Sequence, residues 1–247
     1  MRGSWARSRV WRRVGVWGAA LAVVGVGIDR PAEAHRRDFP FTYDWHQTAR
    51  GEKEFESQTL YSGTERAWQQ QFELEWGVTE RFSVAPYLVF GKGSGEHLRY
   101  EAFKLESRYQ LGTFATNRVL TGLYLEYEKP RSAKGEVEGK LIFSNYGNDG
   151  SDFSVNLIAE KALEKGVKTR TTYSFGYARP IGGAGSRGGF EWIRNLDDGR
   201  VNAGPVFSFL PRIVGGKSTP VTLGYAFPVT RGHGNRGDFR LLMEYEF

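Results

Sequence analysis

The last ten residues, DFRLLMEYEF (Asp238–Phe247), alternate between two kinds of side chain. Successive side chains of a β-strand point to opposite faces. One face would carry Phe239, Leu241, Met243, Tyr245 and Phe247, and the other Arg240, Leu242, Glu244 and Glu246. An apolar, aromatic face opposite a mostly charged face is the pattern of a strand with lipid on one side and water on the other.

The same alternation recurs along the chain, most clearly between Trp68 and Val78, where Phe72, Leu74 and Trp76 alternate with glutamine and glutamate. Similar segments cover 82–90, 103–111, 119–128, 153–160, 171–177, 201–209 and 221–227, and weaker ones cover 55–61, 137–145 and 188–193. With the last segment these make twelve. We therefore predict an all-β fold, a closed antiparallel transmembrane β-barrel of about 12 strands, with 10 or 14 as alternatives.

The charged residues fix the register of the predicted strands. A shift of one residue in the segment 103–111 would turn Lys104 and Arg108 toward lipid. That placement costs roughly 2 to 4 kcal/mol for each cation at the bilayer midplane.

One segment is also compatible with a helix, because residues 156–168 contain AEKALEK, whose residues favour helix. We favour a strand to Glu160 followed by a loop, because lipid accommodates only closed ladders or complete helices.

The N-terminal region has the features of a secretory signal peptide. Several arginines precede an apolar run from Val14 to Ile28, and Ala32-Glu33-Ala34 follows as a small-x-small cleavage site. We assign residues 1–34 to the signal peptide, 35–50 to a periplasmic N-terminal segment or a lumen plug, and 51–247 to the barrel. A tail outside the barrel is the preferred interpretation of 35–50, and a plug is the alternative.

Removal of the leader changes the charge balance of the protein. The whole chain has 34 Lys and Arg against 28 Asp and Glu, and the leader holds six Arg, one Asp and one Glu. The mature balance is then 28 against 26, or +2, with no basic cluster of the kind that nucleic-acid binders carry. The absence of cysteine is compatible with export and leaves stability to strand closure and burial.

Several short motifs resemble a known group of proteins. They are the hairpin 76–82, the strand 156–160, Gly204-Pro205 and the closing strand Arg240–Phe247. Together they look like a group of small transporter-like bacterial outer-membrane β-barrels, some of which are associated with meta-pathway phenol degradation. The resemblance spans most of the mature chain and brings no residue of defined chemical function. The aromatic ending also resembles that of bacterial outer-membrane barrels, which implies that Phe247 and Tyr245 act as an assembly signal.

The polar faces of the predicted strands would line the lumen. The candidate lumen residues are Glu54, Glu56, Glu73, Glu75, Lys104, Glu106, Arg108, Glu126, Glu128, Lys140, Glu160, Arg170, Arg240 and Glu244. Such groups either flank an aqueous path or pair across the lumen and fill it. We expect a channel or transporter for small solutes in the bacterial outer membrane, with a mild preference for cations. The alternative is a closed barrel without an open pore, which either has a structural role or binds a ligand or lipid.

The histidines do not indicate an enzyme. His35 and His46 precede the predicted barrel, whereas His97 and His233 lie in predicted loops, so none sits beside a nucleophile on a strand. We therefore predict no catalytic residues, no metal site and no cofactor. The expected partners are outer-membrane lipids, the barrel assembly machinery and a small solute, with no nucleic acid.

Overall fold

The computed structural model describes residues 36–114, 119–182, 185–214, 217–230 and 236–247. The predicted signal peptide, Met1–Ala34, lies outside these residues and stays a prediction. Within the described residues, no helix is long and apolar enough to cross a bilayer.

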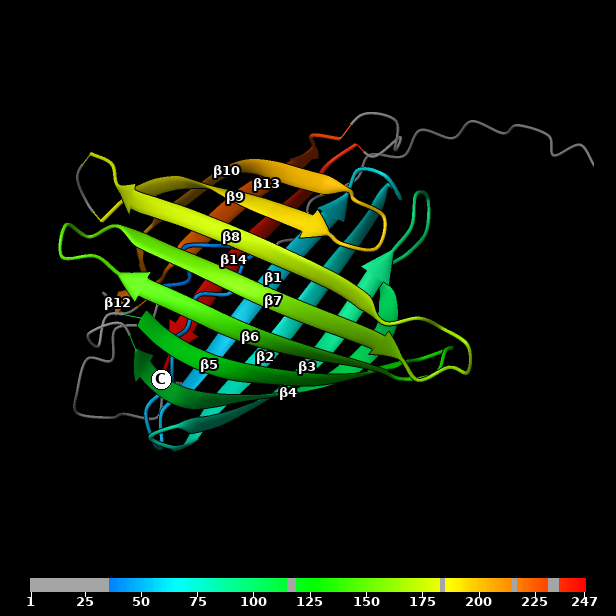
Figure 1. The fold of residues 1–247 in the computed structure, drawn as a ribbon, viewed down its shortest axis with the longest axis horizontal. Helices are drawn as coiled ribbons and strands as arrows, with labels where there is room; N and C mark the ends of the chain where they lie inside the picture. The colour runs from blue at the N-terminus through cyan, green and yellow to red at the C-terminus, as the bar shows by residue number, and fades with distance from the viewer. Residues whose placement is uncertain (1–35, 115–118, 183–184, 215–216, 231–235) are drawn as a thin grey trace, which may run out of the picture.

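Twelve strands form one closed antiparallel barrel (Figure 1), which confirms the predicted fold class and strand number. The strands are β1 (Lys53–Ser62), β2 (Ala67–Thr79), β3 (Phe82–Lys92), β4 (Arg99–Phe114), β5 (Val119–Pro130), β6 (Glu136–Tyr146), β7 (Asp152–Ala162), β8 (Arg170–Pro180), β9 (Arg187–Asn195), β10 (Val201–Phe209), β13 (Val221–Pro228) and β14 (Asp238–Glu246). Each strand pairs with the next, and β14 pairs with β1. Closure leaves no unpaired edge along the sheet.

The closing pair joins the two ends of the barrel in a regular register, from Glu54 opposite Glu246 to Ser62 opposite Asp238. The same residues of β1 pair with β2 on the other side, where Glu56 lies opposite Glu73. Inward positions of three consecutive strands therefore share one level of the lumen. This register brings glutamates from β14, β1 and β2 together inside the barrel.

The outer surface carries the apolar set that the alternation predicts. Leu125, Leu157 and Trp76 are about half exposed, at 55%, 51% and 49% of their residue surface. The inward neighbours Tyr124, Glu126, Asn156 and Glu75 are buried. The predicted register is therefore confirmed, and the outer surface is apolar enough to face lipid.

The strand preferred for the segment 153–160 is confirmed, because β7 runs to Ala162, and the helical alternative for 156–168 is wrong. The connection between β10 and β13 contains a small separate hairpin of β11 (Arg212–Val214) and β12 (Lys217–Ser218). This hairpin does not change the barrel.

The barrel has two rims, which we name by their connections. The chain-end rim contains the start of β1, the end of β14 and the connections at 80–81, 147–151 and 181–186, whereas the far rim contains the connections at 63–66, 93–98 and 131–135. In Figure 1 the chain-end rim lies on the left, where the C-terminus is labelled. The prediction that residues 35–50 start on the periplasmic side implies that this rim faces the periplasm.

Candidate functional site in the barrel lumen

Residues 36–50, which we call the N-terminal plug, lie inside the barrel rather than outside it. Side chains from eight strands hydrogen-bond to them, through Glu56, Glu75, Ser144, Asn156, Glu191, Ser208, Thr222 and Glu244. Phe39, Thr42 and Trp45 are almost completely buried. Figure 1 shows this dark blue segment within the barrel toward the chain-end rim. The structure therefore corrects the preferred interpretation of this segment as an external tail and supports the plug alternative.

The plug enters and leaves the lumen at the same rim. Arg36 donates to the carbonyl oxygen of Gly185 in the 181–186 connection, and the chain returns to the same rim where Gly51 donates to the carbonyl oxygen of Gly77. Between these points it rises to mid-barrel, where Arg240 of β14 donates to the Pro40 carbonyl oxygen at 2.9 Å. The plug is thus a loop that reaches partway up the lumen.

Side chains of the wall satisfy the backbone of the plug. The Tyr43 N–H donates to Asn156 Oδ1 at 2.6 Å, and Asn156 Nδ2 donates back to the Tyr43 carbonyl oxygen at 2.7 Å. The Trp45 N–H donates to Ser144 Oγ at 2.6 Å, and one carboxylate oxygen of Glu191 accepts from Phe41 and Thr42. A buried backbone without a strand partner needs such acceptors. These polar wall residues therefore have a structural role in holding the plug.

Inward-facing glycines make room for the large side chains of the plug. A Cβ atom at Gly176 would lie 2.6 Å from the Phe39 ring, and one at Gly224 would lie 2.6 Å from Pro40 Cγ. A Cβ atom at Gly122 would overlap the Trp45 indole. The wall and the plug are therefore complementary in shape at three separate positions.

Two buried arginines carry most of the positive charge where the plug meets β1, β2, β4 and β14. Arg37 of the plug pairs with Glu56 at 2.8 Å, and its backbone N–H donates to Glu244. Arg108 of β4 pairs with Glu75 at 2.9 Å and with Glu73 and Glu106. Removal of one partner from such a buried pair leaves an uncompensated charge, which is strongly destabilising.

Other contacts of the plug involve charge as well. Arg187 of β9 bridges Asp38 of the plug and Asp152 of β7, at 2.7 and 2.6 Å. The Lys140 ammonium group lies 3.6 Å from the ring centroid of Tyr43 and 3.8 Å from that of Tyr124, in the geometry of a cation–π contact. Burial, together with the nearby Asp38 carboxylate, raises the pKa of Asp44 to about 6.

The predicted lumen residues fall into three groups. Eight are buried within the barrel: Glu56, Glu73, Glu75, Glu106, Arg108, Glu126, Lys140 and Glu244. Five others line cavities or pair inside the lumen: Glu54, Lys104, Glu128, Glu160 and Arg240. Arg170 is different, because its side chain is 60% exposed at the far rim, where it pairs with Glu136 and Glu160.

Sequence reasoning missed several residues that contact the plug or its partners. Tyr87 and Glu191 are fully buried inward residues, and Arg187 pairs with the plug, yet none was a candidate. Tyr87 lies in a strand whose inward face is otherwise small or apolar, and Glu191 lies in one of the weaker segments. The alternation places both residues inward and could have identified them.

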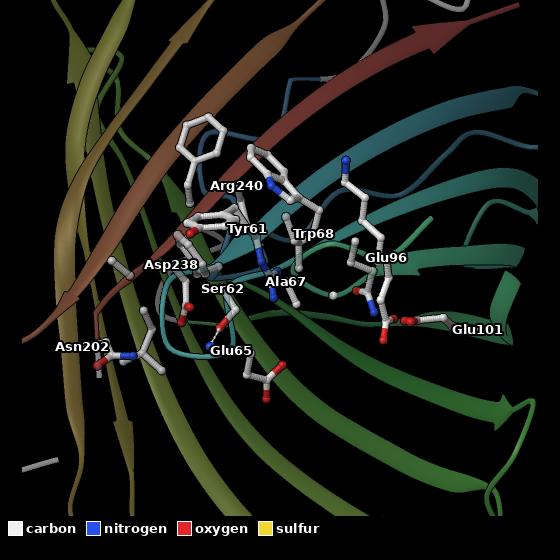
Figure 2. A pocket seen from close by; sticks show the side chains of 18 of the residues that line it. Tyr61, Ser62, Glu65, Ala67, Trp68, Glu96, Glu101, Asn202, Asp238 and Arg240 are labelled. Atoms are coloured by element: carbon white, nitrogen blue, oxygen red, sulfur yellow. Dashed lines mark hydrogen bonds between the residues drawn. The ribbon is translucent and has the colours of Figure 1, made fainter. Parts of the chain in front are cut away.

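The far half of the lumen contains open space, which we call the vestibule. It comprises three cavities of about 640, 570 and 290 Å³. The first and second share Gln69, Arg99 and Glu101, whereas the first and third share Phe41 and Arg240. Figure 2 shows the first cavity, with Arg240 and Asp238 from β14 and with Glu96 and Glu101 among its lining residues. The shared residues make the vestibule one space that ends at the plug.

The vestibule carries an excess of negative charge. The acidic residues among those that line it are Glu65, Glu96, Glu101, Glu126, Glu128, Glu136, Glu138, Glu160 and Asp238, and the basic residues are Lys92, Arg99, Lys104, Arg131, Lys140 and Arg240. Nine acidic against six basic side chains leave an excess of three negative charges. Such a lining attracts cations more than anions.

The described residues contain no group of three His, Asp or Glu side chains arranged to hold a metal ion. His97 lies in the connection between β3 and β4, and His46 lies in the plug. His35 and His233 lie outside the described residues.

Comparison with known proteins shows similarity at the level of the fold. The structure is similar to that of the KdgM porin in complex with disordered oligogalacturonate, with a TM-score of 0.57 and 8% identity over 79% of this chain and 99% of that one. It is also similar to the NanC porin, with a TM-score of 0.55 and 8% identity over 77% and 97% of the two chains. No protein-family model and no curated protein matches the sequence.

Proposed function

We propose that this protein is an outer-membrane channel for small solutes and that residues 36–50 close its path in the conformation described here. The observation that carries this proposal is the arrangement of the lumen, in which a vestibule at the far rim leads inward and ends at the plug. The plug is held by side-chain contacts and is not a strand of the barrel. Its release would join the two halves of the lumen without breaking the sheet.

The outer surface supports a location in the bacterial outer membrane. Exposed leucines and aromatic residues cover the strands, and closed barrels satisfy their backbone groups in lipid. The signal peptide predicted over 1–34 and the porin fold agree with this location. Outer-membrane lipids and the barrel assembly machinery are the proposed partners, with Tyr245 and Phe247 as the proposed assembly signal.

The charge of the vestibule favours small cations or neutral polar solutes over anions. One structural neighbour was studied with oligogalacturonate, which is a polyanion, and nine carboxylate side chains would repel such a molecule. The sequence resemblance to barrels associated with meta-pathway phenol degradation adds small phenolic compounds to the solutes to be tested. Neutral phenols would not be repelled by the vestibule.

A closed barrel that binds a ligand or has a structural role is the second candidate. The observation that favours it is the close fit between the plug and the wall, which leaves little open space in the chain-end half of the lumen. The two proposals differ in whether the plug ever leaves its place.

Single-channel recording separates the two candidates. The mature protein would be refolded in detergent, checked for the heat-dependent shift in gel mobility that folded barrels show, and placed in a planar bilayer with a salt gradient. The channel proposal predicts discrete conductance steps and a reversal potential on the cation-selective side. Folded protein that stays silent, including variants designed to displace the plug, would support the closed barrel, and anion selectivity would contradict the proposed role of the vestibule.

A further inference from the structure

A very small cavity lies where the plug meets the wall of the barrel. Its volume is about 10 Å³, close to the space that one water molecule occupies. The lining residues are Arg37, Asp44 and His46 of the plug, Glu54 and Glu56 of β1, Glu73 and Glu75 of β2, Arg108 of β4 and Glu244 of β14. The cavity therefore lies at the junction of the plug with four strands.

The charges around this cavity do not balance. Six carboxylic acid side chains line it, whereas Arg37 and Arg108 are the two basic side chains with fixed positive charge. If all six acids were ionised, four negative charges would be uncompensated with His46 neutral, and three with it protonated. Buried carboxylates in such numbers are neutralised by protonation rather than held as ions.

Several carboxylate oxygens at the cavity also have no hydrogen-bond partner. They are Asp44 Oδ1, Glu73 Oε2 and Glu244 Oε1, and the three residues are only 4%, 3% and 2% exposed. They come from the plug, β2 and β14. A carboxylate accepts hydrogen bonds only, whereas a protonated carboxyl group also donates one. Protons on these groups would therefore supply both the missing charge and the missing donors.

The neighbouring groups on each element belong to the same network. On the plug they include Asp38 and Tyr43, on β3 Tyr87, on β4 Glu106 and on β14 Glu246. Glu106 forms an ion pair with Arg108 and accepts a hydrogen bond from the Tyr87 hydroxyl group, so it adds no positive charge to the cavity. Asp38 pairs with Arg36 and Arg187. These neighbours do not provide the missing positive charge.

We propose that this cavity is a proton-binding site that holds the plug in place, so that rising pH releases the plug and opens the channel. This inference rests on the proposed function as a channel. In the closed state the protons are held at Asp44, Glu73 and Glu244, whereas in the released state these three groups face water and ionise at ordinary pH values. The closed state binds more protons and is therefore favoured at low pH.

The size of the response depends on the number of protons released. For each proton, the ratio of closed to open channels falls about tenfold per pH unit across the titration range. The pKa of Asp44, raised to about 6 by burial and by Asp38, places one of these groups in a range that the experiment can reach.

The test measures plug release in two ways on the mature protein. The first is open probability in planar bilayers between pH 4 and 9. The second is chemical modification of Thr42→Cys, because Thr42 is completely buried and the native chain has no cysteine. A Glu80→Cys variant, in the exposed turn between β2 and β3, corrects for the reactivity of the thiolate itself.

We expect both open probability and Thr42→Cys modification to rise at least tenfold per pH unit within the titration range. Glu73→Gln and Glu244→Gln keep the shape of the side chain without the titration, so both should flatten the pH response and keep the plug in place at high pH. Glu80→Gln is the matched control and should respond as the native protein does. All variants would first be shown to fold by their heat-dependent gel mobility.

Three outcomes would overturn the proton-binding site. They are a flat response between pH 4 and 9, a pH response that Glu73→Gln and Glu244→Gln leave unchanged, and a response that a chelator abolishes, which would assign the cavity to a metal ion. If Gly122→Ala, which displaces Trp45, conducts while the native protein is silent at every pH, the channel stands and the proton site fails. If neither conducts, the proposed channel fails as well.

Discussion

The two halves of the lumen are lined by similar residues but are built differently. In the chain-end half, Arg108 and its glutamate partners are buried against the plug, and the cavity between them is about the size of one water molecule. In the far half, Lys104 pairs with Glu126 and Glu128 beside a cavity of about 290 Å³. The same alternation of polar residues therefore produces a packed layer in one half and an open lining in the other.

The plug accounts for this difference. It adds a short segment to the chain-end half, together with Phe39, Tyr43 and Trp45, whose rings fill space that the wall leaves open at Gly122 and Gly176. Among the residues that the structure describes, no segment fills the far half in this way beyond Pro40 and Phe41. In a barrel of this size, the state of the lumen thus depends on residues outside the strands.

The largest expected effect comes from removing a charge in the packed half. Arg108→Met leaves Glu75 and Glu106 without their cation and should reduce the free energy of unfolding by about 3 to 5 kcal/mol. Arg99→Met removes an exposed pair with Glu96 in the vestibule and should cost about 0 to 1 kcal/mol. Urea titration of the refolded protein in detergent measures both. Equal losses would show that the two halves do not differ in burial.

A smaller effect is expected from a single methyl group at the contact of plug and wall. Gly122→Ala places a Cβ atom where the Trp45 ring lies, and such overpacking costs about 1 to 3 kcal/mol. This overlap destabilises only the closed state, in which Trp45 lies against Gly122, so open probability should rise by roughly 5- to 150-fold. Gly139→Ala is the control, since its Cβ atom would meet nothing closer than 3.9 Å. Recordings in which both variants match the native protein would contradict the fit described here.

The smallest expected effect concerns the open half. Glu101 lines two of the three cavities of the vestibule, and Glu101→Gln should reduce cation selectivity without changing stability or open probability. The reversal potential in a salt gradient measures this change. Glu80→Gln at the other rim should leave the reversal potential unchanged. A shift as large as that of Glu101→Gln would show that the vestibule does not determine the ion selectivity.

The barrel could be predicted from the sequence because the physical constraint repeats along each strand. A lipid-facing side and a wet side require alternation, so segments such as 68–78 and 119–128 identify both strand and register. The weaker segments 137–145 and 188–193 are strands as well. The inward face of 137–145 includes Ile142 and Ser144, which contact the plug, and that of 188–193 includes Gly189 and Ile193, so the alternation with polar residues is weak in both.

The plug could not be placed from the sequence, because its partners are spread over the whole barrel. Residues 36–50 have no periodic pattern, and their contacts join positions up to 207 residues apart, as between Arg37 and Glu244. Two signals were present: aromatic residues at 39–45 and inward glycines such as Gly176 and Gly224. Neither identifies its partner without the structure. The plug divides the lumen residues into a packed group and an open group. This division could not be predicted from the sequence either.

The most direct test is to lock the plug to the wall and release it again. Pro40 and Gly224 face each other at the top of the plug, and the native chain contains no cysteine, so Pro40→Cys with Gly224→Cys would form one defined disulfide. Single-channel recording at the pH of highest native open probability should show no conductance in the oxidised protein and full recovery after addition of a reducing agent, with Pro40→Cys alone unaffected by either treatment. Conductance that persists with the disulfide formed would show that solutes pass without movement of residues 36–50 and would contradict the plug as the closure of the channel.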